Sequence, residues 1–128
     1  MPAASPSPAR FTDTHEWFRA EGEVVTMGIT QYAANELTDI TYVEMKPAGT
    51  EVRAGSPVGE VESVKTTSDV YTAVGGTIVE VNKAVQNDPA LLNRDPHGGG
   101  WLVKIRTKDS SPLAKLMDQA SYDTKHPV

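Results

Sequence analysis

Short runs of β-branched, aromatic and apolar residues, broken by Gly, Pro or Asn, dominate the pattern along this chain from residue 11 onward. Runs of this length and composition are typical of strands, and the residues between them are typical of turns. The predicted strands cover residues 15–19, 23–29, 40–46, 57–63, 68–74, 77–83 and 101–106. Several short strands joined by turns predict a mainly β domain, built as a sandwich or a barrel.

Three short helical segments are predicted between and after these strands. The first covers residues 30–37 and begins with Thr30, whose side-chain oxygen can cap the free N–H groups of a helix. The second is one turn over residues 89–93, with Asp88 as its cap and a proline at its first position. The third is a C-terminal helix that opens at Ser111 and is followed by a frayed end. One face of that helix would carry Leu113, Leu116 and Met117.

The beginning of the chain differs in composition from the rest. It is rich in Pro, Ala and Ser, so residues 1–10 are predicted to form a disordered tail and residues 11–128 a single domain. The tail resembles neither an Arg-rich transit peptide nor a signal peptide with an apolar core. No apolar run approaches the roughly 18 residues that a membrane span needs, so we expect a cytoplasmic protein without membrane contacts.

The charge and the cysteine content exclude some partners and some kinds of chemistry. The chain carries 17 acidic and 12 basic residues, a net charge of −5. This balance disfavours nucleic acid or an anionic membrane as the main partner, because both require a basic face. Cysteine is absent, so the chain's own side chains cannot perform thiol chemistry. Any dithiol chemistry would have to come from a cofactor.

A polar segment around Lys65 separates two predicted strands near the middle of the chain. This placement predicts that Lys65 lies at or beside the tip of a hairpin, where a modifying enzyme can reach it. The alternative is an ordinary surface lysine, which is the commoner situation for a single lysine. The surrounding residues favour the first interpretation; they are Gly49, Val52, Gly55, Val58, Val61, Glu62, Ser63, Lys65, Asp69, Val70, Ala73, Gly76, Ile78 and Val81. Together these residues resemble the biotinyl/lipoyl attachment domain.

Further motifs distinguish among carriers. Lys65 lacks the flanking methionines of biotin domains, and it lacks the Asp-Lys-Ala motif of lipoyl domains in the longer 2-oxo-acid dehydrogenase chains. The segment is instead Glu62-Ser63-Val64-Lys65 in a short chain. Other motifs are Thr14-His15-Glu16-Trp17, Val43-Glu44-Met45 and Gly99-Gly100-Trp101. With these motifs the chain, from about Phe11 to Tyr122, is similar to the glycine cleavage H-protein family.

This resemblance implies a barrel–sandwich hybrid fold with short helices and a non-catalytic carrier function. Lipoate would be attached to Lys65 by a lipoyl-attaching enzyme that meets the flanking residues Glu62, Ser63, Val64 and Asp69. The arm would take an aminomethyl group from glycine decarboxylase (P protein) to aminomethyltransferase (T protein). Dihydrolipoamide dehydrogenase (L protein) would then reoxidise the arm, so the partners and the cofactor supply the reactions.

Two residues near the start of the domain are candidates for contact with the arm. Glu16 matches a glutamate of the family that lines the cleft for the loaded arm, where a carboxylate can pair with the bound amine. A solvated strand glutamate is an equally good interpretation of this residue. His15 is expected to be a packed, hydrogen-bonded residue beside Trp17 rather than a base or ligand. The three histidines lack the spacing of zinc ligands.

The chain also departs from the family pattern. Thr66 stands where alanine is commoner, residues 72–76 replace the more usual Ala-Pro-Val-Ser-Gly, and His97-Gly98 stands where an aromatic residue is commoner. These differences concern contacts with partner enzymes and leave the class of protein unchanged.

Three other functions compete with this interpretation. A small hydrolase lacks support, because the chain has no recognisable Ser-His-Asp or paired-carboxylate arrangement, and the glycine run 98–100 lacks the ending of a phosphate-binding loop. An SH3-like binding module without cofactor could be built from the same strands. A carrier could also serve another lipoylated complex or relay lipoyl groups to other proteins. Intact mass separates the module from the carriers, and partner assays separate the carriers.

Overall fold

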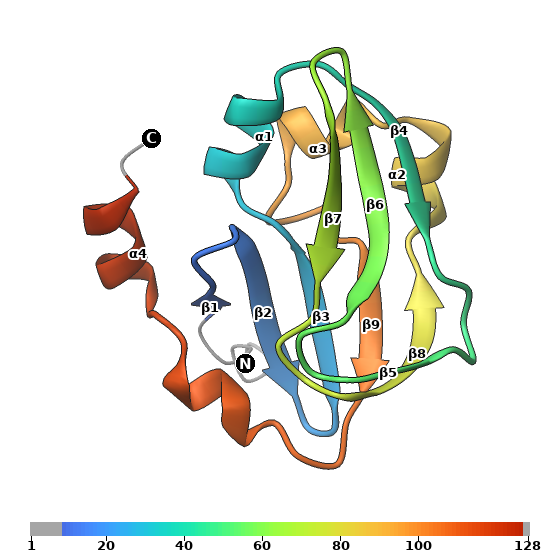
Figure 1. Ribbon diagram of the computed structural model, residues 1–128. Coiled ribbons are helices and arrows are strands. Elements are labelled where there is room, and N and C mark those ends of the chain that lie inside the picture. The colour runs from blue at the N-terminus through green and yellow to red at the C-terminus, as the bar shows by residue number, and fades with distance from the viewer. Residues whose placement is uncertain (1–8, 127–128) are drawn as a thin grey trace, which may run out of the picture.

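The computed structural model describes residues 9–126 and is mainly β, with two sheets and short helices (Figure 1). The larger sheet has the strand order β1-β2-β3-β9-β8-β5 and the smaller sheet the order β4-β6-β7. The strands are β1 (Arg10–Phe11), β2 (Glu16–Glu21), β3 (Val24–Ile29), β4 (Ile40–Met45), β5 (Glu51–Val52), β6 (Pro57–Ser63), β7 (Thr67–Tyr71), β8 (Gly76–Val81) and β9 (Val103–Arg106). All neighbouring strands pair antiparallel. The predicted mainly β architecture is confirmed.

The main core lies between the two sheets. Apolar side chains point inward from both sheets. Val25 and Met27 alternate along β3, whereas Val58 and Val61 of β6 are three residues apart because the register of β6 shifts near Val58. Each of these four side chains is fully buried. The register pairs Val61 with Ser68 of β7, so residues 62 and 67 face outward together at the end of the hairpin.

A second, smaller cluster covers the other face of the larger sheet. Trp17 and Phe18 are adjacent in β2, so their side chains point to opposite faces, and Trp17 packs with Phe11 and Tyr122. The rings of Phe11 and Tyr122 are stacked with centroids 4.8 Å apart. Figure 1 shows the C-terminal segment running alongside β1 at this place. The C-terminal segment is therefore part of the folded domain.

The helix at residues 30–37 is confirmed, as α1 (Gln31–Leu37) with Thr30 as its cap. The oxygen Oγ1 of Thr30 accepts a hydrogen bond from the N–H of Ala33 at 3.1 Å. The structure adds α2 (Lys83–Asn87), which overlaps the end of the strand predicted at 77–83 and is capped by Asn82. The sequence pattern missed α2 because Val81 and Asn82 continue the alternation of β8 as far as the first turn of the helix.

The one-turn helix predicted at 89–93 lies slightly later, as α3 (Leu91–Arg94). The prediction that the side chain of Asp88 caps it is wrong. The N-cap position belongs to Ala90 and makes no side-chain hydrogen bond. The carboxylate of Asp88 instead forms an ion pair with Arg94, with 2.6 Å between the charged atoms.

The single C-terminal helix predicted from Ser111 is also wrong. The segment is a 3₁₀ helix, η1 (Ser111–Lys115), followed by a separate helix, α4 (Gln119–Lys125). The chain is extended between them because Met117 exchanges two backbone hydrogen bonds with Phe11, at 2.9 and 3.1 Å. The frayed end expected after this helix is not seen up to residue 126, since Asp118 caps α4 and Tyr122 of α4 is buried.

The ends of the described region also bear on the predicted boundaries. Residue Arg10, expected in the tail, belongs to β1, because β1 pairs with β2. The rest of the predicted tail up to residue 8 lies outside the described residues. None of the helices between residues 9 and 126 has the length and apolar character that crossing a membrane requires.

Candidate functional site

Lys65 lies in the turn that joins β6 and β7, as the sequence predicts. Ser63 closes this turn: its N–H donates to the carbonyl of Thr66 at 2.8 Å, and its Oγ accepts from the N–H groups of Lys65 and Thr66 at 3.1 and 3.2 Å. A serine side chain can make such local bonds without glycine in the turn. Ser63 therefore holds the shape of the tip on which Lys65 stands.

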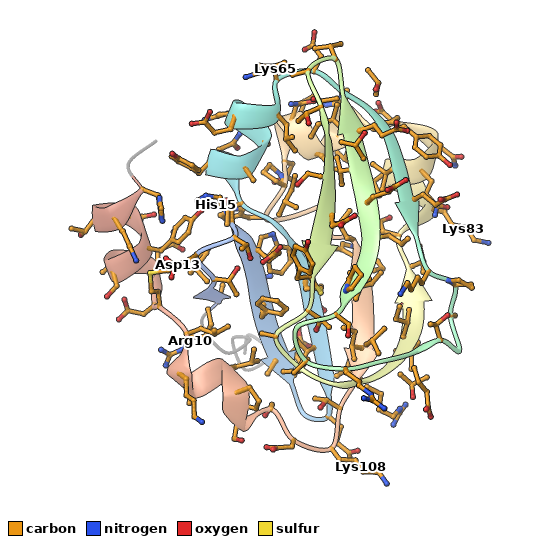
Figure 2. All side chains as sticks on the ribbon, in the orientation of Figure 1. Arg10, Asp13, His15, Lys65, Lys83 and Lys108 are labelled. Carbon is orange, nitrogen blue, oxygen red and sulfur yellow. The ribbon has the colours of Figure 1, made fainter. Side chains whose placement is uncertain are left out.

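The tip is tied to the segment around α1. The N–H of Val64 donates to the carbonyl of Asp39 at 3.0 Å, and the ammonium group of Lys65 donates to the carbonyl of Glu36 at 3.2 Å. Figure 2 shows Lys65 at the top of the hairpin, above α1. The Lys65 and Val64 side chains are exposed. An accessible amine thus stands on a fixed support.

Carboxylates flank the tip on the outer face of the smaller sheet. Glu62 on β6 is half-buried and accepts from the hydroxyl of Thr67 at 3.4 Å, whereas Asp69 on β7 is exposed. Glu60 stands directly opposite Asp69 in the register. The surface around Lys65 is therefore acidic, which suits contact with a basic surface of another protein.

A cavity of about 140 Å³ lies between α1 and the β6–β7 hairpin. Its residues come from the start of β2, from β3, from α1 and from the hairpin: Thr14, His15, Glu16, Ile29, Ala33, Glu36, Leu37, Val61, Ser68, Asp69 and Val70. Glu36 links the cavity to the tip, because its carbonyl is the acceptor for the Lys65 ammonium group. The lining combines apolar residues of β3, α1 and the hairpin with polar ones, among which Glu16, Glu36 and Asp69 are acidic.

Glu16 is buried, with 2% of its surface exposed. The interpretation of this residue as a solvated strand glutamate is therefore wrong. Its carboxylate accepts hydrogen bonds from the hydroxyls of Thr12, at 2.6 Å, and Thr14, and from the N–H of Tyr71 at 3.1 Å. No salt bridge among the residues of the described region, 9–126, involves this carboxylate.

Burial raises the pKa of Glu16 above its ordinary value of 4.5, and the three donors act in the opposite direction by favouring the charged form. The folded state therefore binds the proton more tightly than the unfolded state. The contribution of Glu16 to wild-type stability should therefore fall as the pH rises from 4.5 through the folded pKa.

Glu16→Gln should remove this pH dependence, because an amide of the same shape does not ionise. We expect the free energy of unfolding of the variant minus that of wild type to be larger at pH 7 than at pH 4, so that the variant gains stability relative to wild type as the pH rises. Urea denaturation of both proteins at the two pH values measures this difference. If the free energy of unfolding of the variant minus that of wild type is the same at both pH values, or larger at pH 4, the pKa of Glu16 is not raised.

His15 is a packed residue, as expected. Its Nδ1 and the hydroxyl of Tyr122 lie 2.7 Å apart in a hydrogen bond, and its ring lies beside those of Tyr32 and His126. The hydroxyl of Tyr122 also bonds to Thr30 at 2.8 Å. The sequence did not identify Tyr122 as part of this site, because α4 was not predicted.

Comparison with known proteins adds a separate line of support. The profile of the glycine cleavage H-protein family matches residues 9–126 of this chain. The glycine cleavage system H protein of Acinetobacter baumannii (strain AYE) is 45% identical over 118 residues, which cover 92% of this chain and 95% of the relative. The H protein of Thermus thermophilus is 46% identical over 112 residues, 88% of each chain.

The fold is similar as well. The crystal structure of a glycine cleavage system H protein from Mycobacterium marinum matches with a TM-score of 0.85 and 35% sequence identity. The match covers 97% of this chain and 100% of that chain.

Proposed function

Because the chain belongs to the glycine cleavage H-protein family, whose members are lipoyl carriers, we propose that its lipoate is attached to Lys65. We further propose that it carries the aminomethyl group of glycine from glycine decarboxylase (P protein) to aminomethyltransferase (T protein), with dihydrolipoamide dehydrogenase (L protein) as the third partner. Bound lipoate supplies two sulfurs that can be reduced and reoxidised, a chemistry that a chain without cysteine cannot supply itself. On this proposal the protein positions the carried group and its partners perform the reactions.

The position of Lys65 is the observation that carries the proposal. Acylation of a lysine requires an amine that an enzyme can reach from outside, and the tip of the β6–β7 hairpin offers one. The amine makes one weakly held, exposed hydrogen bond, to the carbonyl of Glu36. Releasing this bond costs little, because the lysine exchanges it for water.

The neighbouring cavity is the place that we propose for the loaded arm. It shares Glu36 with the Lys65 contact, so it opens beside the attachment point. Glu16, which lines it, is a buried carboxylate without a cationic partner among the described residues. An amine that is protonated near neutral pH complements this carboxylate, and a shielded site strengthens the attraction.

The first test is the intact mass of the protein after co-expression with a lipoyl ligase, with peptide mapping of any adduct. One lipoyl group on Lys65 supports the carrier function. An unmodified protein would instead favour the SH3-like binding module.

The residues that flank Lys65 should govern how well the attaching enzyme works. Glu62→Gln and Asp69→Asn are each expected to slow lipoylation about two- to five-fold, since an exposed charge contributes roughly 0.4–1 kcal/mol to such an encounter. The measurement is the initial rate of lipoylation by purified ligase at low ionic strength, where charge effects are least screened.

Glu51→Gln is the matched control for these two variants. Glu51 is an exposed glutamate on β5, at the opposite end of the molecule from Lys65 (Figures 1 and 2). This variant should be lipoylated at the wild-type rate. Equal rates of lipoylation for all three variants would show that the enzyme does not recognise the carboxylates of Glu62 and Asp69.

A further inference from the structure

Helix α1 forms one wall of the cavity, and a segment more than fifty residues later in the chain bonds to both of its ends. This segment consists of the end of α3 and the turn that follows it. At the C-terminal end, the amide of Asn93 donates to the carbonyl of Thr38 at 2.7 Å and accepts from the N–H of Ile40 at 3.0 Å. At the N-terminal end, Nε2 of His97 accepts from the N–H of Gln31 at 3.1 Å. Helix α3 and the turn after it therefore clamp α1 at both ends.

The helix needs such support because it is short. A helix of 7 residues is not stable on its own in water. The N–H groups of its first turn have no partner within the helix. Thr30 satisfies the N–H of Ala33, and His97 satisfies the N–H of Gln31. Loss of the His97 bond would leave the first N–H of α1 without that acceptor.

The bond from Gln31 depends on the protonation state of His97. A ring nitrogen accepts a hydrogen bond only when it carries no proton, so the imidazole must be neutral with its proton on Nδ1. The ring lies beside those of Phe11 and Trp17, with centroids 6.0 and 6.1 Å away. A charged imidazolium would be poorly solvated there and would point an N–H at the N–H of Gln31.

The surroundings of His97 shift its pKa in opposite directions. Burial lowers the pKa of His97, and the positive charge of Arg19 on β2 lowers it further. Asp123 on α4 and Asp95 at the end of α3 act in the opposite direction. The facing residue of α1, Gln31, is neutral. The neutral form is therefore favoured near neutral pH, and acidification below the ordinary value of 6.5 is needed to protonate the ring.

We propose that His97 is a positioning residue for the arm cavity: its neutral ring holds the first turn of α1 against the turn that follows α3, and its protonation loosens this wall. Three residues of α1, Ala33, Glu36 and Leu37, line the cavity, so a change in the helix reaches the group that the cavity shields. This inference rests on the proposed carrier function, because it assigns a purpose to the cavity. It predicts that acid shortens the lifetime of the loaded aminomethyl group by loosening the protein.

Amide hydrogen exchange of the unmodified protein tests the clamp without any cofactor. We expect His97→Phe, which keeps an aromatic ring but has no acceptor, to lower the protection factor of the Gln31 amide about ten-fold. His97→Gln, which keeps an acceptor but does not titrate, should retain most of that protection. Between pH 7 and pH 5, protection at Gln31 should fall in wild type and stay constant in His97→Gln, after correction for intrinsic exchange. The amide of Val25, in the paired strand β3, should not change in any variant.

Hydrolysis of the loaded aminomethyl group tests the link from the clamp to the cavity. Loss of the group should be a few-fold faster in His97→Phe and near the wild-type rate in His97→Gln. If the protection of the Gln31 amide is unchanged in His97→Phe, His97 does not clamp the helix. If that variant does not fold, equal pH profiles of Gln31 protection in wild type and His97→Gln lead to the same conclusion. Lower protection with unchanged hydrolysis overturns the link to the cavity. Absence of an adduct on Lys65 overturns the proposed function, and the exchange data still decide whether His97 holds α1.

Discussion

A Lys65→Arg protein co-expressed with a lipoyl ligase should keep its unmodified mass, while the parent protein gains one lipoyl group. Arginine preserves the positive charge at the hairpin tip but has no amine that can be acylated under these conditions. The turn should be unaffected, since its bonds come from Ser63 and the backbone. The expected effect is complete loss of modification with little change in the free energy of unfolding.

Lys83→Arg is the control for this experiment. Lys83 is also exposed, but it opens α2, away from the hairpin (Figure 2). This variant should be lipoylated to the same extent as the parent. An adduct that persists in Lys65→Arg, or one that disappears in Lys83→Arg, would show that Lys65 is not the attachment site.

The second large effect is expected at Glu16, in the lifetime of the loaded aminomethyl group. Glu16→Ala should be lipoylated normally, because Glu16 is buried away from the exposed tip that the ligase meets. Its loaded group should then be lost to water about ten-fold faster than in the parent. Two opposite charges about 4 Å apart in a partly shielded site attract by a few kcal/mol before desolvation costs, and about 1.4 kcal/mol is enough for a ten-fold change.

Glu16→Gln separates charge from shape. Glutamine can keep hydrogen bonds with the Thr12 and Thr14 hydroxyls and the Tyr71 N–H, but it has no charge to attract an ammonium group. Hydrolysis in this variant should be close to that of Glu16→Ala if the charge holds the amine, and close to the parent if Glu16 only fills space. Equal rates in all three loaded proteins would show that Glu16 does not hold the arm.

The same experiments address the competing functions. A binding module without cofactor predicts no adduct in the parent protein. A carrier for another complex predicts an adduct on Lys65 but no loading by glycine decarboxylase. Only the proposed carrier predicts both the adduct and a loading step whose product Glu16 protects.

The sequence by itself was enough to predict the elements whose signals are local. Alternating apolar residues and turn residues marked every strand except the two-residue strands β1 and β5, because side chains on a longer strand alternate between core and solvent. The polar segment between two strands placed Lys65 at a hairpin tip, since a tight connection between paired strands must lie at the end of the sheet. Thr30 marked the start of α1 because a cap acts within three residues of its own position.

Tertiary structure alone decided the features that depend on contacts between distant residues. Strand β1 has two residues and exists because β2 pairs with it, and the extended break before α4 exists because Met117 bonds to Phe11. The buried carboxylate of Glu16 accepts a hydrogen bond from the N–H of Tyr71, 55 residues away, and the clamp on α1 depends on His97, 66 residues from Gln31. No local pattern carries such information, because a hydrogen bond formed across the fold leaves its donor and acceptor looking like ordinary polar residues in the sequence.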